Sequence, residues 1–356
     1  TREIVICFLI IAWAVLTLPL SFWPAGSIGV LTDLYIKSVT IFFLLPNIVT
    51  TPARLRSIAL TLVICAIPIA LISLKNYVTG NFIIGSDPSF ERVLGYQSGL
   101  ASNPNDMALM LNLILPLAIA LFLQKPRPGL AFLCFIAVIL DATGVIVSMS
   151  RAGFIGLAIT AILYFTRLAR RPGRDRKLAM TALALAILAV PLLPSNYVER
   201  IASIADKNAD PTGSAQARWQ GNIAAVRFIQ QRPVFGAGLG MGMIALNMTG
   251  GPLWHDVHNV YLQYAVDLGL PGLALFLLLM FGVISAVRSA RNSSAELPAL
   301  RNVFLLDEAI QISLVVFAAT SFFYPVAYHF YFYYMGGLAL AARVATANAL
   351  AEAKEA

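Results

Sequence analysis

The stretch WHDVHNVYLQ, residues 254–263, holds two of the three histidines of the chain and leads directly into a long apolar run. It follows a long polar insertion, so we expect these histidines at the edge of a membrane span. Imidazole takes up or releases a proton near neutral pH, which makes a histidine at a water–lipid boundary a candidate base. The alternative is a structural role, in which the rings hydrogen-bond lipid headgroups or loop backbone.

The composition of the whole chain is that of a membrane protein. Hydrophobic residues make up 59% of the 356 residues, charged residues make up 12%, and the mean hydropathy is +0.80. A soluble domain with one core does not tolerate these values, so the sequence predicts an all-α polytopic membrane protein. The net charge of +8 is interpreted as a sign of membrane topology, and it favours anionic lipid over nucleic acid as a partner. The three cysteines lie apart in apolar runs and predict neither disulfides nor a metal site.

Apolar stretches recur along the whole chain. A helix needs roughly 20 apolar residues to cross the hydrocarbon layer, and about ten stretches approach that length. They are 4–20, 34–50, 56–76, 105–123, 130–149, 152–168, 178–194, 260–287, 303–324 and 327–347. Because the chain starts at Thr1, we expect residues to be missing before it. No internal repeat is evident, so a single transmembrane domain over 1–356 is the simplest organisation.

Basic residues in short loops mark the cytoplasmic side of a membrane protein. The clear marks are Arg54 and Arg56, Lys125 and Arg127, the arginine and lysine run over 167–177, and Arg288, Arg291 and Arg301. Two predicted spans separate each successive pair of marks. The segments 77–104, 150–153 and 195–259 are therefore expected on the outer, periplasmic face. The insertion 195–259 is large enough to fold partly by itself and is expected to contain short helices and part of the active site.

Arg151 interrupts an apolar run about twice the length of one span. An arginine inside hydrocarbon costs roughly 2.5 to 3.5 kcal/mol, so Arg151 is expected at the outer turn between two antiparallel helices. Ser150 can cap the second helix, and Gly153 permits close approach. A role as a topology anchor is the alternative, but such anchors prefer the cytoplasmic side.

The insertion contains a predicted helix over 214–229, with Ser214 as its N-cap. Apolar residues recur there at three- and four-residue steps, which indicates a helix lying along the membrane surface with its apolar stripe down. These residues are Trp219, Ile223, Val226 and Ile229. Arg218 and Arg227 lie on opposite sides of this helix, so only one can face a site, and we predict Arg218. The glycine-rich segment 235–242 that follows is predicted to be a flexible or closely packed connector, since neither a strand nor Gly-Lys-Ser/Thr accompanies it, with phosphate contact from its backbone amides as the alternative.

Two outer arginines and one histidine favour a particular chemistry. The planar guanidinium fork suits phosphate oxygens, so two arginines could hold a diphosphate while a neutral histidine takes a proton from an attacking hydroxyl. No Asp-x-Asp or His-Glu-x-x-His pattern occurs, which predicts a reaction without metal or other cofactor.

Three further polar features have weaker interpretations. Residues 103–106, Asn-Pro-Asn-Asp, predict a helix cap, with a role in lining the site as the alternative. Asp141 is a functional candidate because it lies in mid-span, although no partner for it is evident. His329 belongs to an aromatic belt and is predicted to be structural.

The order of these segments resembles a known family. His258-Asn259, nine residues and Gly269-Leu270-Pro271-Gly272 resemble the His-Asn-x9-Gly-x-x-Gly signature of the bacterial O-antigen ligase family. The segments 103–106, 150–153, 218–219 and 232–240 look like the same family and occur in the same order.

The resemblance implies a glycosyltransferase-C-like fold of about twelve spans, each of roughly 20 residues, in the bacterial inner membrane. It also implies a periplasmic active site that transfers a glycan from undecaprenyl diphosphate to a sugar hydroxyl of lipid A core. His258 would be the base, and Arg151 and Arg218 would bind the diphosphate. Glycan polymerases and protein O-oligosaccharyltransferases have similar patterns and remain alternatives. A transporter or flippase for a lipid-linked anion is the alternative of another class.

Overall fold

The computed structural model describes residues 1–83, 93, 95, 103–192, 195–202, 214–252 and 254–355. Over these residues the chain is helical, with no β-strand and one isolated bridge between Phe82 and Val93. Among the same residues, 8 helices are long and apolar enough to cross a membrane. The predicted all-α polytopic membrane protein is thereby confirmed.

The eight candidate spans correspond to eight of the predicted ones. They are Arg2–Leu20, Pro24–Ile48, Pro52–Val78, Pro104–Leu123, Pro128–Val147, Arg151–Ala169, Val260–Ala295 and Pro298–Phe323. The other two predicted spans, 178–194 and 327–347, are helices α8 (Arg174–Ala189) and α14 (Phe330–Glu355). Helix α8 has 16 residues and a length of about 24 Å, which is less than the hydrocarbon thickness. Helix α14 has a polar second half that includes Arg343, Asn348 and Glu352.

The chain divides into two compact units. The first, called the histidine unit here, comprises Thr1–Leu55 and Gly213–Ala356. The second, called the central unit, comprises Arg56–Thr212. Arg218 and His258 thus belong to the histidine unit, whereas Arg151 belongs to the central unit.

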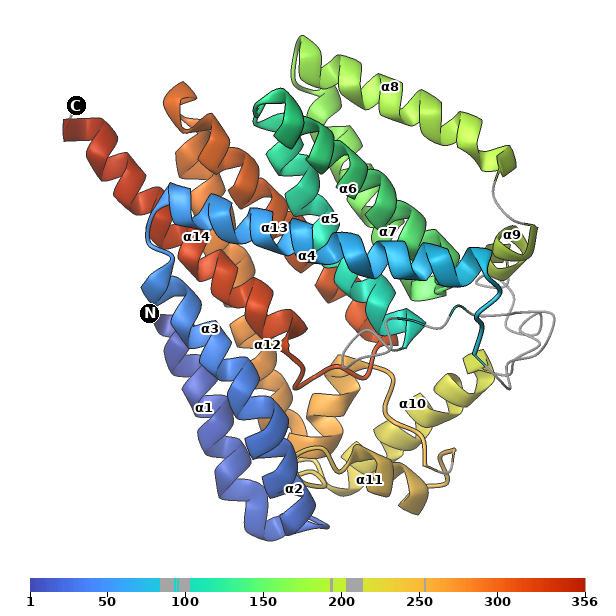
Figure 1. The fold of residues 1–356 in the computed structure, drawn as a ribbon. Coiled ribbons are helices and arrows are strands. Elements are labelled where there is room, and N and C mark those ends of the chain that lie inside the picture. Colours follow the sequence, from blue (N-terminus) through green and yellow to red (C-terminus); the bar gives the residue numbers. More distant parts are fainter. Residues whose placement is uncertain are drawn as a thin grey trace. The chain divides into compact units, whose positions relative to one another are not determined.

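The central unit is built from consecutive helices that pack in pairs: α5 (Pro104–Leu123), α6 (Pro128–Val147), α7 (Arg151–Ala169) and α8 (Figure 1). The hydroxyl of Tyr164 in α7 donates to the carbonyl of Pro116 in α5 at 2.8 Å. Because α6 and α7 form one antiparallel pair, the α5–α6 and α7–α8 connections lie at the same end.

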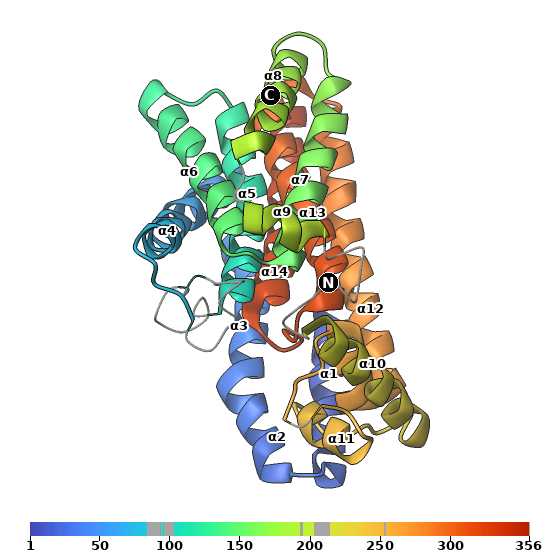
Figure 2. The ribbon, with the colours of Figure 1, turned by 90° about the vertical axis from the view of Figure 1, so that its right-hand side faces the viewer.

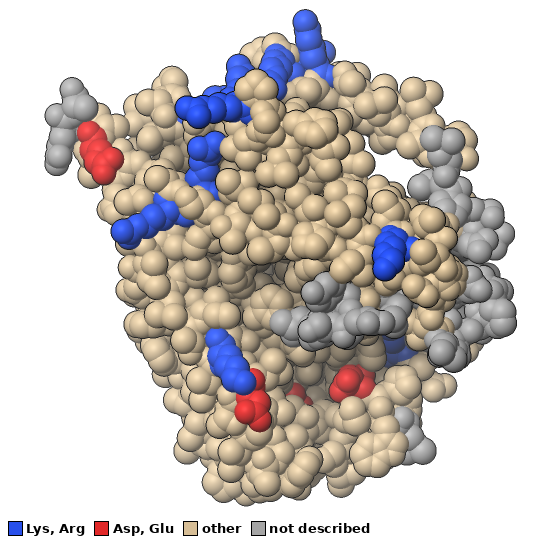
Figure 3. All heavy atoms as spheres, in the orientation of Figure 1, with Lys and Arg blue, Asp and Glu red and all other residues tan. Residues whose placement is uncertain are grey.

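Exposed basic side chains collect at that end of the central unit. They are Lys125, Arg127, Arg170, Arg174, Arg176 and Lys177. Figure 3 shows lysine and arginine side chains gathered over the upper ends of α6 and α8. The sequence predicts this arrangement, because two spans separate the basic loop at 125–127 from the basic run at 167–177 and so place both on the same side.

The histidine unit is organised around α12 (Val260–Ala295). Helices α1 (Arg2–Thr17), α13 (Arg301–Thr320) and α14 pack against it, and α3 (Ile36–Ile48) packs against α14. Three buried tyrosines link these elements through their hydroxyls: Tyr264 to Tyr333 at 2.6 Å, and Tyr333 to Tyr35 at 3.0 Å. A hydroxyl in such a place needs a partner, and each of these supplies one for the next.

The insertion 195–259 contains helices α9 (Ser195–Ala202), α10 (Ser214–Gln231) and α11 (Gly242–Met248) over its described residues. Helices α10 and α11 lie beside the first turns of α12 (Figure 2). A small apolar core holds them there, and its members include Phe228, Met241, Leu246, Val257 and Val266.

Candidate functional site

The histidine loop, residues 254–259, lies between α11 and α12. The two neighbours of His258, Val257 and Asn259, are both held in place by contacts with the rest of the unit. Val257 is buried in the small apolar core, with 2% of its surface exposed. Asn259 is the N-cap of α12, and its side-chain oxygen accepts from the backbone N–H groups of Tyr261 at 2.9 Å and Leu262 at 3.2 Å. An N-cap of this kind stabilises the helix start. The His-Asn pair therefore couples the candidate base to a rigid helix terminus.

The ring of His258 has a defined tautomer. Its Nδ1 lies 2.9 Å from the carbonyl oxygen of Asp256, and a carbonyl oxygen can only accept, so Nδ1 carries the hydrogen. The lone pair of the neutral ring is therefore on Nε2. Burial lowers the pKa of His258, and the positive charge of Arg218 lowers it further, against the opposing effects of the carbonyl and carboxylate of Asp256. Near neutral pH the ring is neutral and can accept a proton.

Arg218 lies in the first turns of α10, close enough to His258 for its charge to act on that ring. Arg227 is exposed on the same helix. The structure thus brings Arg218 and His258 together within the histidine unit.

Helix α10 packs on the unit through the face opposite its large apolar stripe. Small residues and Phe228 pack against the unit, with Ala224 1% and Ala225 0% exposed. Trp219, Ile223 and Val226 point outward instead, with 54%, 37% and 45% of their surfaces exposed. Small side chains permit the close approach of α10 to its neighbours, which leaves the large apolar stripe free for lipid, as expected for a surface helix.

Helix α12 is broken at Gly269, which has φ 70° and ψ −177°. Only glycine adopts this conformation readily, and a Cβ there would overlap the carbonyl oxygen of Val234. The break releases the carbonyls of Val266, Asp267 and Leu268 from the helix, and Pro271 has no N–H to offer. The Gly-x-x-Gly part of the motif therefore marks a break rather than a ligand loop.

The groups released by the break all find partners in the histidine unit. The carbonyl of Val266 accepts from Ala237 N–H at 2.8 Å, and that of Asp267 accepts from Gly238 N–H at 2.9 Å. The indole of Trp13 donates to the carbonyl of Leu268 at 2.8 Å. Leu270 N–H donates to the carbonyl of Pro233 at 2.7 Å. The glycine-rich connector is therefore closely packed and serves as the hydrogen-bonding partner of the broken helix.

No role in this region was predicted for Asp267 or Tyr328. The carboxylate of Asp267 is fully buried and accepts from Gly240 N–H at 3.1 Å and from the hydroxyl of Tyr328 at 3.0 Å. It joins the connector, the break and the segment before α14. The signal in the sequence was a charged residue inside a predicted span.

Hydrogen bonds of Ala327 to Gln263 and Tyr264 hold the segment before His329 on the first turns of α12. The carboxylate of Asp256 acts electrostatically on both His258 and His329. His255 is exposed, with its ring centroid 6.3 Å from that of His258. Among the described residues no three His, Cys, Asp or Glu side chains gather into a metal-binding group.

In the central unit, two of the predicted motifs meet. Ser150 caps α7: its hydroxyl oxygen accepts from Gly153 N–H at 3.1 Å, and the hydroxyl donates to the side-chain oxygen of Asn105 at 2.9 Å. The amide of Asn112 donates to the carbonyl of Gly153 at 2.9 Å. Residues 103–106 and 150–153 therefore share one end of this unit.

Arg151 is the first residue of α7. The helix dipole disfavours a cation at this position, so helix stability does not explain an arginine here. Arg151 belongs to a different unit from Arg218 and His258, so its closeness to these two residues stays a prediction.

Asp141 is fully buried in α6, and neither of its carboxylate oxygens has a hydrogen-bond partner among the described residues. A functional role for it stays a prediction.

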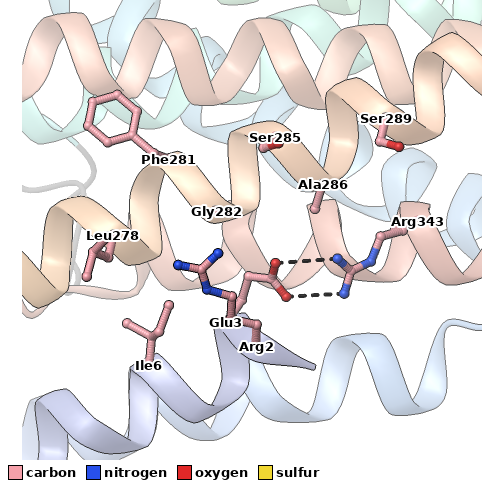
Figure 4. Close-up of a pocket in the computed structure, with 10 residues that line it drawn as sticks. All are labelled: Arg2, Glu3, Ile6, Leu278, Phe281, Gly282, Ser285, Ala286, Ser289 and Arg343. Carbon is pink, nitrogen blue, oxygen red and sulfur yellow. Dashed lines mark hydrogen bonds and ion pairs between the residues drawn. The ribbon is translucent and has the colours of Figure 1, made fainter.

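A cavity of about 380 Å³ lies elsewhere in the histidine unit, between α1, α12 and α14 (Figure 4). Figure 4 shows Glu3 paired with Arg343, at 3.2 Å between Oε2 and Nη2, with Arg2 beside them. None of the predicted site residues lines this cavity.

Comparison with known proteins places part of the chain in a family. No curated protein matches this sequence. Residues 136–277 match the family model described as O-Antigen ligase. The matched range contains Arg151, Arg218, His258 and the break at Gly269. The predicted resemblance to the O-antigen ligase family is thereby confirmed over residues 136–277.

Proposed function

We propose that this protein transfers a glycan from undecaprenyl diphosphate to a sugar hydroxyl of lipid A core, on the periplasmic side of the bacterial inner membrane. The observation that carries the proposal is the neutral tautomer of His258, with Nδ1 on the carbonyl of Asp256 and Arg218 nearby. A base with a free Nε2 beside a cation suits attack by a hydroxyl on a phosphate-activated sugar.

In the proposed reaction Nε2 of His258 takes the proton of the acceptor hydroxyl. The hydroxyl oxygen forms a bond to the anomeric carbon of the glycan, and the bond from that carbon to the diphosphate oxygen breaks. Undecaprenyl diphosphate leaves with the electron pair of that bond. Arg218 and Arg151 bind the diphosphate and offset the negative charge that grows on it.

This mechanism requires one transmembrane domain over 1–356 in which the two units bring Arg151 to the other two residues. A spin label at each of the exposed positions 103 and 255, measured by pulsed electron resonance, tests it, because residues 103–106 share one end of the central unit with Arg151. If the distance between the two labels is longer than two side chains and a diphosphate can span, Arg151 does not bind the same diphosphate as Arg218.

The acceptor distinguishes this proposal from its neighbours in the family. A glycan polymerase uses a growing glycan, and a protein O-oligosaccharyltransferase uses a Ser or Thr hydroxyl. Purified protein is incubated with lipid-linked glycan and each acceptor in turn. Labelled product on core lipid supports the ligase, and product on only one of the other acceptors selects that activity instead.

A transporter or flippase is the alternative from another class, and the broken α12 is the observation that favours it, because transporters bind substrates at broken helices. In such transporters the freed backbone groups bind the substrate. Here the carbonyls of Val266, Asp267 and Leu268 are used within the protein. In sealed vesicles, lipid-linked glycan that changes leaflet without transfer to an acceptor would favour the transporter.

We also propose that the reaction needs no metal and no other cofactor. Full activity is expected in the presence of a chelator. Activity that a divalent cation restores after chelation would contradict this part of the proposal.

A further inference from the structure

The segment 324–329, which precedes α14, is bound to the first turns of α12. Ala327 N–H donates to the side-chain oxygen of Gln263 at 3.1 Å, and the carbonyl of Ala327 accepts from the hydroxyl of Tyr264 at 2.9 Å. The hydroxyl of Tyr328 donates to Asp267. Because α12 starts directly after the histidine loop, these three bonds hold the segment that ends at His329 on the side of α12 from which that loop extends.

His329 presents one edge of its ring. The side chain is half-buried, and its Nδ1 is buried without a hydrogen-bond partner among the described residues. The accessible edge is therefore the one with Nε2. Burying an N–H without an acceptor is unfavourable, so the hydrogen of the neutral ring belongs on Nε2. Burial lowers the pKa of His329, which favours that neutral ring, although the carboxylate of Asp256 opposes the effect.

The two histidines then have opposite tautomers. His258 offers a lone pair at Nε2, whereas His329 offers an N–H there. One is suited to accept a proton, and the other is suited to donate a hydrogen bond to an oxygen that does not react.

The charged groups that act on the two rings differ. Both Arg218 and Asp256 act electrostatically on His258, whereas Asp256 is the charged group that acts on His329 among the residues that the structure describes. A carboxylate repels phosphate, but it accepts hydrogen bonds from neutral hydroxyls. A sugar hydroxyl can donate to Asp256 and accept from the N–H of His329.

We propose that His329 and Asp256 form a subsite for a sugar hydroxyl beside the catalytic His258. The inference rests on the proposed function for the identity of the sugars, and it adds residues that bind saccharide rather than diphosphate. The sugar belongs either to the acceptor or to the glycan of the donor, and both present the same chemistry.

The test measures binding in the His258→Ala background, where turnover does not consume the ligands. The probes are delipidated core oligosaccharide, lipid-linked glycan and undecaprenyl diphosphate without a glycan. His329→Phe removes both ring nitrogens, His329→Gln keeps an amide N–H near Nε2, and Asp256→Asn removes only charge from an exposed side chain.

Loss of one such hydrogen bond is expected to weaken saccharide binding by about tenfold in the Phe variant, with part of the loss recovered by Gln. Asp256→Asn should also weaken it. Binding of undecaprenyl diphosphate should not change, and whichever saccharide probe loses affinity identifies the source of the sugar. His255→Gln, which removes an exposed imidazole from the same loop, is the matched control and should leave all three affinities unchanged.

The inference is overturned if His329→Phe and Asp256→Asn leave both saccharide affinities unchanged, or if they weaken the binding of undecaprenyl diphosphate as much as that of the saccharides. Because Asp256→Asn is isosteric and exposed, misfolding of the Phe variant does not hide the answer. Transfer assays with the wild-type protein test the proposed function on its own, and absence of transfer to every acceptor would contradict it. The binding measurements test the subsite independently of transfer.

Discussion

The turn at Ser150 in the central unit and the break at Gly269 in the histidine unit are both family motifs that contain glycine, but they are held in different ways. At Ser150 the partners are Gly153, three residues away, and Asn105 in the next packed helix. At Gly269 the partners come from 233–238 and from Trp13, which is 255 residues from Leu268. The first motif is a local cap with one neighbour, whereas the second exists only in the finished fold.

The largest expected effect separates chemistry from binding. His258→Ala should lower the rate of transfer by roughly 10²- to 10⁴-fold, because general base catalysis contributes about that much. Donor binding and the melting temperature should be retained. Normal turnover in this variant would remove His258 from the mechanism.

The next effect tests the break. Gly269→Ala should destabilise the protein by about 3 kcal/mol or more, because the backbone conformation is strained for alanine and the methyl group overlaps Val234. Gly250 is the matched control: its φ is also positive, at 74°, but a Cβ there meets nothing within 4 Å. Gly250→Ala should cost about 1 kcal/mol. Equal melting temperatures for the two variants in detergent would show that the break is not tightly held.

The arginines should affect the donor rather than the chemistry of the hydroxyl. Arg151→Ala and Arg218→Ala should each weaken binding of undecaprenyl diphosphate by roughly 10- to 100-fold, since hydrogen bonds to charged groups contribute about 1.5 to 3 kcal/mol. Lys should restore charge but not the two-pronged geometry. Arg227→Ala, on the exposed part of α10, should have no effect. If Arg151→Ala also has none, the central unit does not take part in donor binding.

Removal of the local cap should be mild. Ser150→Ala should destabilise the protein by about 1 kcal/mol, as expected for an N-cap, and this can be measured as a small fall in melting temperature. A fall comparable with that of Gly269→Ala would contradict the distinction between the two motifs. A loss of transfer at unchanged stability would instead place Ser150 in contact with substrate.

The smallest effect concerns pH. The charge of Arg218 helps to hold the pKa of His258 below its usual range, so Arg218→Gln should raise that pKa. The acid side of the pH–rate profile should then move to higher pH, because the neutral base is lost at a higher pH than in the wild-type protein. An acid side that stays in place or moves to lower pH would contradict the assigned proximity of the two residues.

The sequence predicted the features that depend on local patterns. Apolar length predicted the spans, and Ser150 and Asn103 were recognisable as caps because capping residues sit directly before the helices they stabilise. Arg218 was separated from Arg227 by helical geometry alone.

The features that were missed depend on contacts between distant segments. Tyr328 and Asp267 are 61 residues apart, and His329 lies in an aromatic run with no pattern that links it to Asp256. The face by which α10 packs on the unit was not predicted, because Ala224 and Ala225 give no apolar stripe that would indicate a close contact. Spacing within a segment carries no information about these partners.

The hydrogen bonds at Gly269 also bear on biosynthesis. Trp13 and residues 233–238 precede α12 in the chain, so a ribosome delivers every backbone partner of the kinked span before the span itself emerges. Nascent α12 can enter the bilayer without exposing bare amides or carbonyls to lipid. The side chains of Gln263, Tyr264 and Asp267 must wait, because their partners Ala327 and Tyr328 are translated later. Truncation of the chain just after α13 should therefore leave a correctly bent helix whose three polar side chains lack these partners and are exposed to the quality-control proteases of the membrane.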